Sequence, residues 1–346
     1  MSVRLFGHHE GQQVFEIALR SEEGAEADII TYGAAVRDLR TPAAGSMQRV
    51  VNGLLTMEDY LSYSPHFGAI AGRFANRING GRFELDGLKY ELPLNQDNKH
   101  SLHGGPAGFS KQVWQLAAHD GDSVTLTLVS PDGQANYPGT LVALCSYRLI
   151  GTVLQIELRA TTDKATPINL CSHSYFNLDG SPTILDHELE VAADFYTPVD
   201  ADLIPTGEIR HVGGTPLDFR QPRPVRLRDQ QTASLFRYDH NYVLHRTEWQ
   251  HSDPRELPLS FAARLASKRN GLMMEVWTTE PGLQVYDGVQ TNLAVPGHDG
   301  VIYGPNSGLC LEPQHFPDSP NNSHFPETIL RPTQVYRQRT EYRFRH

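Results

Sequence analysis

Asp-Gly and Asn-Gly pairs are the feature that most restricts how this chain of 346 residues can fold. Such pairs tolerate the positive φ angles of tight turns, and between alternating apolar segments they indicate β-hairpins. The sequence therefore predicts many short strands joined by turns. Nine pairs are spread along the chain: Asn52-Gly53, Asn79-Gly80, Asp86-Gly87, Asp120-Gly121, Asp132-Gly133, Asp179-Gly180, Asn270-Gly271, Asp287-Gly288 and Asp299-Gly300.

The segments between these turns change polarity at every second residue. Residues 124–128, 154–159 and 272–276 alternate in this way, with Met273 as an exception in the third. A period of two places one face of a strand in the interior and the other in water. Helical patterns are scarce, and only residues 56–61 favour a short helix, with Thr56 as its N-cap.

No internal repeat and no Gly/Ser-rich linker divides the chain. Many strands, few helices and an undivided sequence favour one large antiparallel β-sandwich. We therefore expect an all-β protein in which residues 1–346 form a single domain.

Charge and cysteine content limit the partners and the compartment. The formal net charge of -10 argues against a nucleic-acid partner. No segment approaches the ~20 apolar residues of a membrane span, and the N-terminus lacks a signal-like apolar run. The three cysteines, Cys145, Cys171 and Cys310, are odd in number and far apart, so neither a disulfide framework nor a zinc knuckle is indicated. We expect a cytoplasmic protein without a membrane partner.

Residues 72–78 contain two arginines and an asparagine within five positions, Arg73, Asn76 and Arg77. Guanidinium and amide groups offer several fixed donors, which suits a ligand rich in hydroxyl groups. The alternative is structural, because arginines also cap loops and pair with carboxylates.

His100 and His103 lie in a loop that continues into Gly104-Gly105. Two histidines at this spacing could hold a metal, but no acidic or cysteine ligand follows at a suitable distance. A ligand-binding loop fits better, since glycines let the backbone approach a ligand closely.

Two further segments carry candidate proton-transfer groups. His173 lies in a polar and aromatic stretch, and its ordinary pKa of about 6.5 suits a general acid. Cys171 shares a strand face with His173 and could be a nucleophile, although a buried, inert cysteine is more common. Glu312 ends an apolar segment before a proline, where a carboxylate is held firmly enough to act as a general base.

Together these segments resemble the aldose 1-epimerase (galactose mutarotase) family from about Val50 to Tyr336. The family is known for a large antiparallel β-sandwich, the galactose mutarotase-like supersandwich. The motifs that carry the resemblance are Glu58-Asp59-Tyr60-Leu61, Ser64-Pro65, Phe67-Gly68-Ala69, Ala75-Asn76-Arg77-Ile78, Ser101-Leu102-His103-Gly104-Gly105, His173-Ser174-Tyr175-Phe176-Asn177-Leu178, Asp239-His240-Asn241, Pro281-Gly282-Leu283-Gln284-Val285-Tyr286 and Glu312-Pro313-Gln314.

The resemblance implies an isomerase that interconverts the α and β anomers of free hexoses such as glucose and galactose. It implies that His173 is the general acid and Glu312 the general base, with no metal and no cofactor. The implied sugar contacts are Asn76, Arg77, His103, Asp239 and Gln284. The chain departs from the family pattern at residues 170–172, at Ser174 and at Thr333, where a glycine is common. A monomer and a homodimer are both compatible with the sequence.

Three rival functions remain open at this point. A glycosidase would pair Glu312 with a second carboxylate such as Asp239. A non-catalytic sugar-binding module would usually lack the histidine or the glutamate. An epimerase for phosphorylated hexoses would need an anion pocket, to which Arg73 and Arg220 could contribute.

Overall fold

The structure is a computed structural model that describes every residue of the chain except 1, 44, 229–233 and 246–257. Within the described residues, strands dominate and neighbouring strands of the three large sheets pair antiparallel. The all-β class predicted from the sequence is confirmed.

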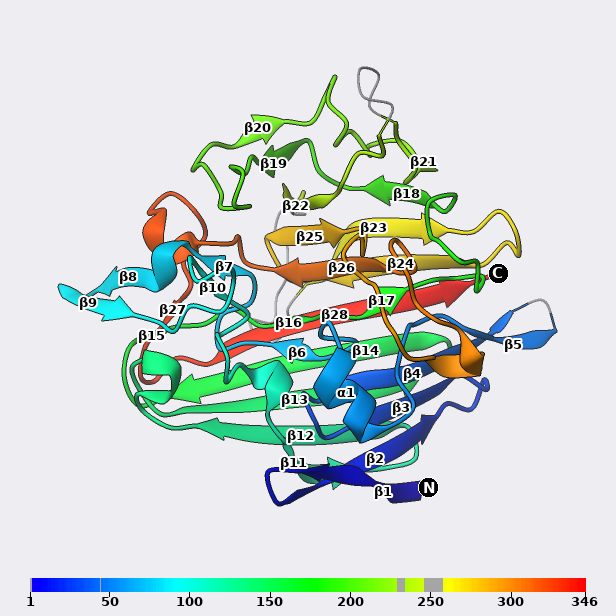
Figure 1. The fold of residues 1–346 in the computed structure, drawn as a ribbon, viewed down its shortest axis with the longest axis horizontal. Coiled ribbons are helices and arrows are strands. Elements are labelled where there is room, and N and C mark those ends of the chain that lie inside the picture. Colours follow the sequence, from blue (N-terminus) through cyan, green and yellow to red (C-terminus); the bar gives the residue numbers. More distant parts are fainter. Residues whose placement is uncertain (1, 44, 229–233, 246–257) are drawn as a thin grey trace.

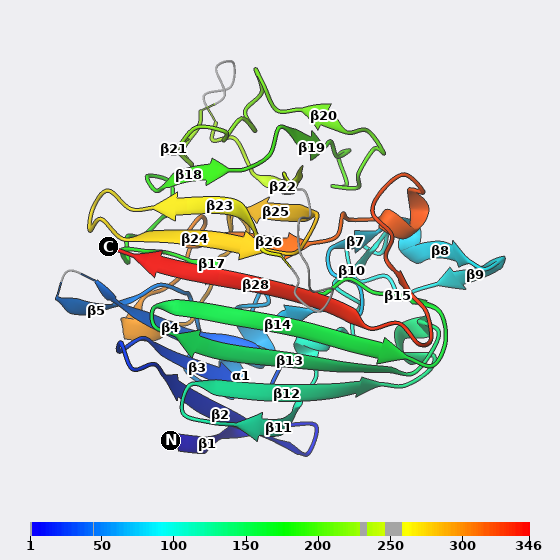
Figure 2. The same ribbon diagram turned by 180° about the vertical axis from the view of Figure 1, so that it is seen from behind.

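The largest sheet has nine strands and forms one layer of the molecule (Figure 2). Its order is not the order of the sequence, because the C-terminal strand inserts between two strands far from it in the chain. From edge to edge it contains β11 (Gln115–His119), β12 (Ser123–Ser130), β13 (Leu141–Ile150), β14 (Val153–Thr162), β28 (Tyr336–Arg345), β24 (Met273–Thr278), β23 (Ser260–Ala266), β18 (Glu188–Val191) and β21 (Arg223–Pro224).

Two further sheets lie over this one and form the second layer (Figure 1). The first has five strands in sequence order: β1 (Ser2–His9), β2 (Gln12–Arg20), β3 (Glu26–Ile30), β4 (Ala35–Ala43) and β5 (Ser46–Arg49). The second has six strands: β17 (Tyr175–Phe176), β26 (Leu309–Gln314), β25 (Gly282–Tyr286), β22 (Asp239–Val243), β19 (Phe195–Thr197) and β20 (Arg210–His211).

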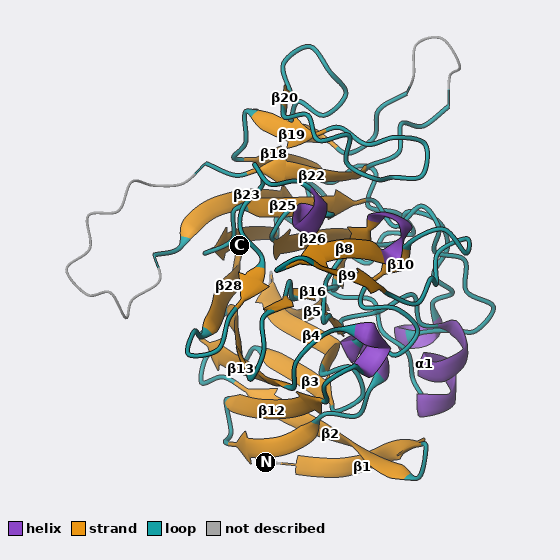
Figure 3. Ribbon diagram, turned by 90° about the vertical axis from the view of Figure 1, so that its left-hand side faces the viewer, coloured by secondary structure: helices purple, strands orange, loops and turns teal. Residues whose placement is uncertain are grey.

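The single described α-helix and the hairpin of residues 82–91 lie on the outer side of the second layer (Figure 3), and three further short strand pairs complete the described sheets. The helix is α1 (Met57–Tyr63), and the Thr56 hydroxyl accepts a hydrogen bond from the Asp59 amide, as its predicted N-cap role requires. No described helix is long and apolar enough to cross a bilayer. The short pairs are β6 (Ile70–Ala71) with β16 (Cys171–Ser172), β7 (Arg77–Ile78) with β10 (Ser101–Leu102), β8 (Arg82–Leu85) with β9 (Leu88–Glu91), and β15 (Thr166–Pro167) with β27 (Ile329–Leu330).

The main core fills the space between the two layers, and strand alternation decides which residues enter it. On β26, Leu309 and Leu311 belong to this core. Successive side chains point to opposite faces, so Cys310 and Glu312 point away from the nine-stranded sheet. Both are nevertheless buried, because the outer loops cover that face. A polar site can therefore form beneath the loops without interrupting the apolar core.

The turn pairs are hairpins less often than the sequence predicts. Asp86-Gly87, Asp120-Gly121 and Asn270-Gly271 join paired strands, whereas the other six pairs lie in longer connections or bends. Asp179 and Asp287 show the reason, since each carboxylate accepts a hydrogen bond from the amide two residues ahead, at 2.8 and 3.1 Å. Asp-Gly suits such local turns as well as hairpins.

Thr333 has a φ angle of 73°, in the left-handed region that favours glycine. Its β-branched side chain is strained there, so we expect Thr333→Gly to stabilise the protein by about 1 kcal/mol, less the entropy that glycine loses on folding. Urea denaturation measures this change. Thr333→Ala retains the Cβ atom and should gain less; an equal gain in both variants would contradict the explanation.

Candidate active site

Three neighbouring strands of the six-stranded sheet align a row of polar side chains. Gln284 on β25 lies opposite Asn241 on β22 and opposite Glu312 on β26. All three are at most 3% exposed. The register thus fixes the candidate base, Glu312, beside Gln284 on a paired strand of the sheet.

His173 reaches the same place from the short link between β16 and β17. Its backbone amide donates to the Ala69 carbonyl at 2.9 Å, and its carbonyl accepts from the Gly68 amide at 3.0 Å. These two bonds fix the link to the loop that precedes β6. The candidate acid and base are 139 positions apart in the sequence and are held by separate elements.

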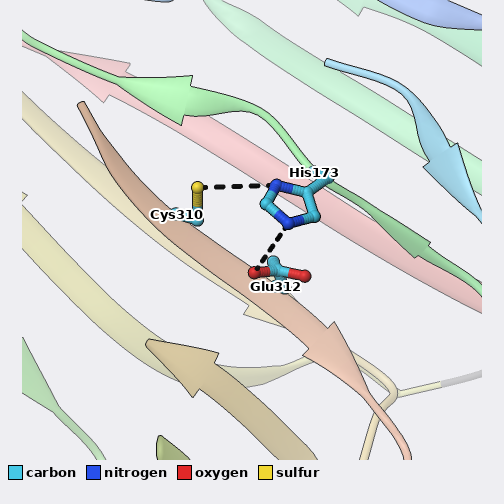
Figure 4. A group of neighbouring side chains, drawn as sticks. All are labelled: His173, Cys310 and Glu312. Carbon is cyan, nitrogen blue, oxygen red and sulfur yellow. Dashed lines mark hydrogen bonds and ion pairs between the residues drawn. The ribbon is translucent and has the colours of Figure 1, made fainter. Parts of the chain in front are cut away.

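Figure 4 shows His173 between Cys310 and Glu312. Nε2 of His173 lies 3.7 Å from Oε1 of Glu312, and Nδ1 lies 3.6 Å from the Cys310 sulfur. The other carboxyl oxygen, Oε2, accepts a hydrogen bond from the Cys171 thiol at 3.3 Å. His173 and Glu312 are 5% and 2% exposed, so little water screens them.

Burial shifts both groups towards their uncharged forms. Desolvation raises the pKa of Glu312 to about 8, against the lowering effects of the Cys171 hydrogen bond and of Arg77. Desolvation, with a contribution from His66, lowers the pKa of His173 to about 3. At neutral pH the carboxyl group of Glu312 is therefore protonated beside an uncharged His173 imidazole.

A second group of polar side chains is held in place by mutual hydrogen bonds. Arg77 donates to Gln96 at 2.8 Å and pairs with Asp239 at 3.4 Å. Gln284 donates to the other oxygen of Asp239 at 2.5 Å. Nδ1 of His103 accepts from the backbone N–H of Asn76 at 3.1 Å, which leaves Nε2 of the neutral imidazole as a donor.

One pocket of about 280 Å³ is lined by all seven of the residues that the resemblance assigned to the site. This volume is close to the lower end of the range of about 300–1,000 Å³ for small-molecule sites. The lining also includes the aromatic residues Tyr175 and Tyr286, and four residues that received no role from the sequence: Pro65, His66, Leu102 and Gln290. Of these, His66 has a side chain that can exchange protons and form hydrogen bonds. It lies between the family-like motifs Ser64-Pro65 and Phe67-Gly68-Ala69, neither of which includes it.

His100 does not share a ligand with His103. Nδ1 of His100 accepts from the Gly80 amide at 3.1 Å, and its side chain lies outside the pocket lining. The two histidines thus bond different backbone segments, and only His103 lines the pocket. This arrangement supports a ligand-binding loop and not a pair of metal ligands.

His173, Cys310 and Glu312 are also close enough together to be considered as metal ligands. Their arrangement favours hydrogen bonding, because the sulfur and the carboxylate lie at different nitrogens of the same ring (Figure 4). One ion cannot lie along both nitrogen lone pairs. Desolvation also raises the pKa of both Cys171 and Cys310 well above the usual value, so neither is an activated thiolate or nucleophile.

Arg73 is a structural residue and not a ligand of the pocket. It is 2% exposed, and its guanidinium donates to the carbonyls of Pro138, Gly139 and Ser130 and to the hydroxyls of Ser130 and Thr166. Of the two alternatives open for this arginine, the structure supports the capping of loops.

We expect Arg73→Met to destabilise the fold by about 3 kcal/mol or more, because several buried acceptors lose their donor. The midpoint of urea unfolding measures the loss. Arg82→Met, at an exposed arginine, is the matched control and should change the midpoint little. A small effect at Arg73 would contradict its structural role.

Among the described side chains, the thiol of Cys171 donates a hydrogen bond to the Glu312 carboxyl group. A donor favours the ionised carboxylate, so Cys171→Ser should move the carboxyl-dependent limb of the pH–rate profile to lower pH. Cys171→Ala should move it to higher pH. Cys145→Ala, at a buried cysteine outside the pocket, is the control. Shifts of the same sign in both Cys171 variants would refute the assignment.

Fold and pocket together define a class of protein: a β-sandwich with a buried histidine–glutamate pair in a pocket lined by polar side chains. The sequence model of the family described as aldose 1-epimerase matches residues 16–343. The chain belongs to the aldose 1-epimerase family, whose members are isomerases.

Individual relatives agree over nearly the whole chain. Galactose mutarotase from Rattus norvegicus is 40% identical over 96% of this chain and 95% of the relative. Aldose 1-epimerase from Escherichia coli (strain K12) is 35% identical over 97% and 96%. Among solved structures, an aldose epimerase homologue from C. elegans superposes with a TM-score of 0.89 at 30% identity, covering 96% of this chain and 98% of that one.

Proposed function

We propose that this enzyme interconverts the α and β anomers of free hexoses such as glucose and galactose. The observation that carries the proposal is the buried pair of His173 and Glu312, 3.7 Å apart in a pocket lined by hydroxyl-binding side chains. The relatives named as galactose mutarotase and aldose 1-epimerase support the same substrate class.

Anomer exchange needs two proton movements. One proton leaves the anomeric hydroxyl and one reaches the ring oxygen, which opens the ring to an aldehyde. The carbonyl turns, and the reverse transfers close the ring on its other face. No electrons are exchanged with another molecule, so one acid and one base suffice, and each transfer contributes about 10²–10⁴-fold in rate.

Sugar binding supplies hydrogen bonds that favour the charged forms of Glu312 and His173. The anomeric hydroxyl donates to the Glu312 carboxyl, which favours its ionised form, and the ring oxygen accepts from Nε2 of His173, which favours the imidazolium. The proton carried by Glu312 in the empty pocket thus moves to His173 when the sugar enters. Glu312 then acts as the general base and His173 as the general acid.

The remaining side chains hold the sugar while its carbonyl turns. We assign hydroxyl contacts to Arg77, His103 and Asp239, with Asn76 and Gln284 contributing amide groups. The mutual bonds of Arg77, Asp239 and Gln284 keep these groups in fixed positions before the ligand arrives. Such preorganisation reduces the entropy lost on binding.

The rival functions have weaker support. Asp239 bonds to Gln284 and Arg77 and is better placed to bind hydroxyls than to act as a second glycosidase carboxylate. For a phosphorylated hexose, Arg73 bonds backbone carbonyls outside the pocket, and Arg220 pairs with Asp218 and Asp194. A non-catalytic module would not need the buried acid–base pair.

Polarimetry on freshly dissolved α-D-glucose and α-D-galactose tests the proposal. The enzyme should accelerate equilibration of at least one sugar, whereas His173→Ala and Glu312→Ala should each nearly abolish the effect. Full activity in either variant would refute the assignment. Cleavage of an aryl glycoside that depends on Glu312 would favour a hydrolase, and activity confined to a hexose phosphate would favour the third rival.

We also propose that residues 1–346 work as one domain in the cytoplasm. The main core draws residues from Ile17 to Phe344, which supports a single unit. The three cysteines are buried and unpaired, which is compatible with a reducing compartment. Light scattering of the purified protein distinguishes the monomer from the homodimer.

A further inference from the structure

A third imidazole faces the pocket beside the two that the sequence identified. His66 lies in the loop between α1 and β6, with its ring centroid 4.9 Å from that of His103 and 5.7 Å from that of His173. It lines the same 280 Å³ pocket as the acid–base pair. The rings of His103 and His173 are themselves in edge-to-face contact, with centroids 5.2 Å apart, so a ligand that contacts both must pass close to His66.

The three imidazoles share one arrangement: each has Nδ1 engaged by the protein. His103 uses Nδ1 to accept from the Asn76 amide, and Nδ1 of His173 faces the Cys310 sulfur. Nδ1 of His66 lies 3.0 Å from the Ser110 hydroxyl. In each ring Nε2 is the nitrogen left for a ligand, and that of His173 is the nitrogen that faces Glu312.

The anchor of His66 is itself firmly held. Ser110 is 5% exposed and lies on the short 3-10 helix η2 (Phe109–Lys111). That segment is tied to the chain just after β6, because the Phe109 amide donates to the Gly72 carbonyl at 2.8 Å. The orientation of the His66 ring is thus fixed before any ligand binds.

The backbone of His66 is in an uncommon conformation, with a φ angle of 71°. Non-glycine residues in this region are infrequent and often mark sites where position matters more than local stability. Burial lowers the pKa of His66 to about 4, so its ring is uncharged at neutral pH and offers one donor and one acceptor. Such a group suits a hydroxyl of a sugar and does not attract an anion.

We propose that His66 contacts the sugar through Nε2 and bonds one particular hydroxyl, so that it determines which aldoses this enzyme prefers. The inference rests on the proposed function and adds a specificity-determining residue to it. Ser110 is the positioning residue that aims the imidazole.

The informative variant is His66→Phe, which keeps a planar ring and removes both nitrogens. Alanine is less suitable because His66 also lines a neighbouring cleft of about 600 Å³, into which the pocket would open. Since phenylalanine tolerates a positive φ poorly, Ser110→Ala provides a second test that leaves residue 66 unchanged. Thermal melting of each variant shows that it is folded.

Each variant is assayed on D-glucose and on D-galactose, 2-deoxy-D-glucose and D-xylose, each of which differs from D-glucose in the hydroxyl or hydroxymethyl group at one carbon. For sugars that carry the contacted group, His66→Phe should raise KM about tenfold, the value of one neutral hydrogen bond, with a smaller effect on kcat. For the sugar that lacks it, the variant and the parent enzyme should have equal KM values. Ser110→Ala should give the same ranking of sugars with smaller changes.

His9→Phe is the matched control, since His9 lines the outer cleft and not the pocket. It should leave KM unchanged for all four sugars. An equal effect of His66→Phe on every sugar, or an effect on kcat alone, would overturn the inference.

Failure of the proposed function would be seen separately, as a parent enzyme that accelerates none of the sugars. Calorimetric titration with D-galactose then tests His66 without catalysis. About tenfold weaker binding by His66→Phe supports the contact, and unchanged binding or no binding by the parent enzyme overturns it.

Discussion

Replacing Glu312 by glutamine is expected to reduce the mutarotation rate by about 10²–10⁴-fold while it makes the protein more stable at alkaline pH. The amide has nearly the shape of the carboxyl group but cannot accept the proton of the anomeric hydroxyl. Polarimetry on D-galactose, with thermal melting across pH, measures both effects on one sample.

The stability gain follows from the direction of the pKa shift. The pKa of Glu312 is raised to about 8 in the folded protein, from 4.5 in an unfolded chain. The wild-type protein therefore loses stability as pH rises from 4.5 to 8, because the folded state resists ionisation. The full cost above pH 8 is on the order of 5 kcal/mol. Glutamine avoids it, so the melting temperatures should agree near pH 4 and diverge by pH 9.

Glu275→Gln is the matched control at a buried carboxylate outside the pocket. Burial acts to raise the pKa of Glu275, but hydrogen bonds from Trp277 and Arg264 lower it overall. Its neutralisation should therefore reduce stability at neutral pH and leave mutarotation intact. A Glu312→Gln variant that stays active, or is less stable at pH 9, would contradict the roles given to this carboxyl group.

Replacing His173 by glutamine is the second change with a large expected effect, again a rate loss of about 10²–10⁴-fold. Glutamine can still hydrogen-bond the ring oxygen but cannot carry a transferable proton. The loss should appear in kcat more than in KM, because proton donation matters most in the transition state. Polarimetry over a range of sugar concentrations separates the two constants.

His173→Gln should also change how the protein responds to acid. The pKa of His173 is lowered to about 3 in the folded state, from 6.5. The stability contributed by this group is complete above pH 6.5 and is lost as pH falls towards 3. The variant should thus lose less stability between pH 6.5 and 4 than the wild type does.

His187→Gln is the control for this effect. His187 is buried away from the pocket, its Nε2 accepts from the Leu178 amide at 3.0 Å, and burial lowers its pKa as well. This variant should also be less sensitive to acid, yet it should retain mutarotation. Equal rate losses at His173 and His187 would show that the assay reports folding and not catalysis.

Much of the architecture was readable from local patterns. Alternation over residues 124–128 and 154–159 predicted strands that the structure contains as β12 and β14, and Thr56 caps α1 as expected. These features depend on neighbours within a few residues, which a sequence displays directly. The turn pairs were less informative, because Asp-Gly forms local turns in loops as readily as hairpins.

The candidate site was only partly readable. Family motifs named seven residues that line one pocket, but their local sequence gave Arg73 and Arg77 similar chemistry. Only the structure separates them, since Arg73 turns to the carbonyls of Pro138 and Gly139 while Arg77 faces Asp239. His66 was not predicted because a single histidine between two recognised motifs carries no periodic or spacing signal.

The Asp-Gly and Asn-Gly turns and the alternating segments determined the all-β fold class by themselves. Turn chemistry and a period of two are properties of neighbouring residues, which the sequence displays directly. Tertiary structure alone decided how the strands are ordered, with β28 between β14 and β24, and which polar groups meet. It also decided their ionisation. Desolvation moves the pKa values of His173 and Glu312 in opposite directions, and desolvation exists only once distant segments close over the site.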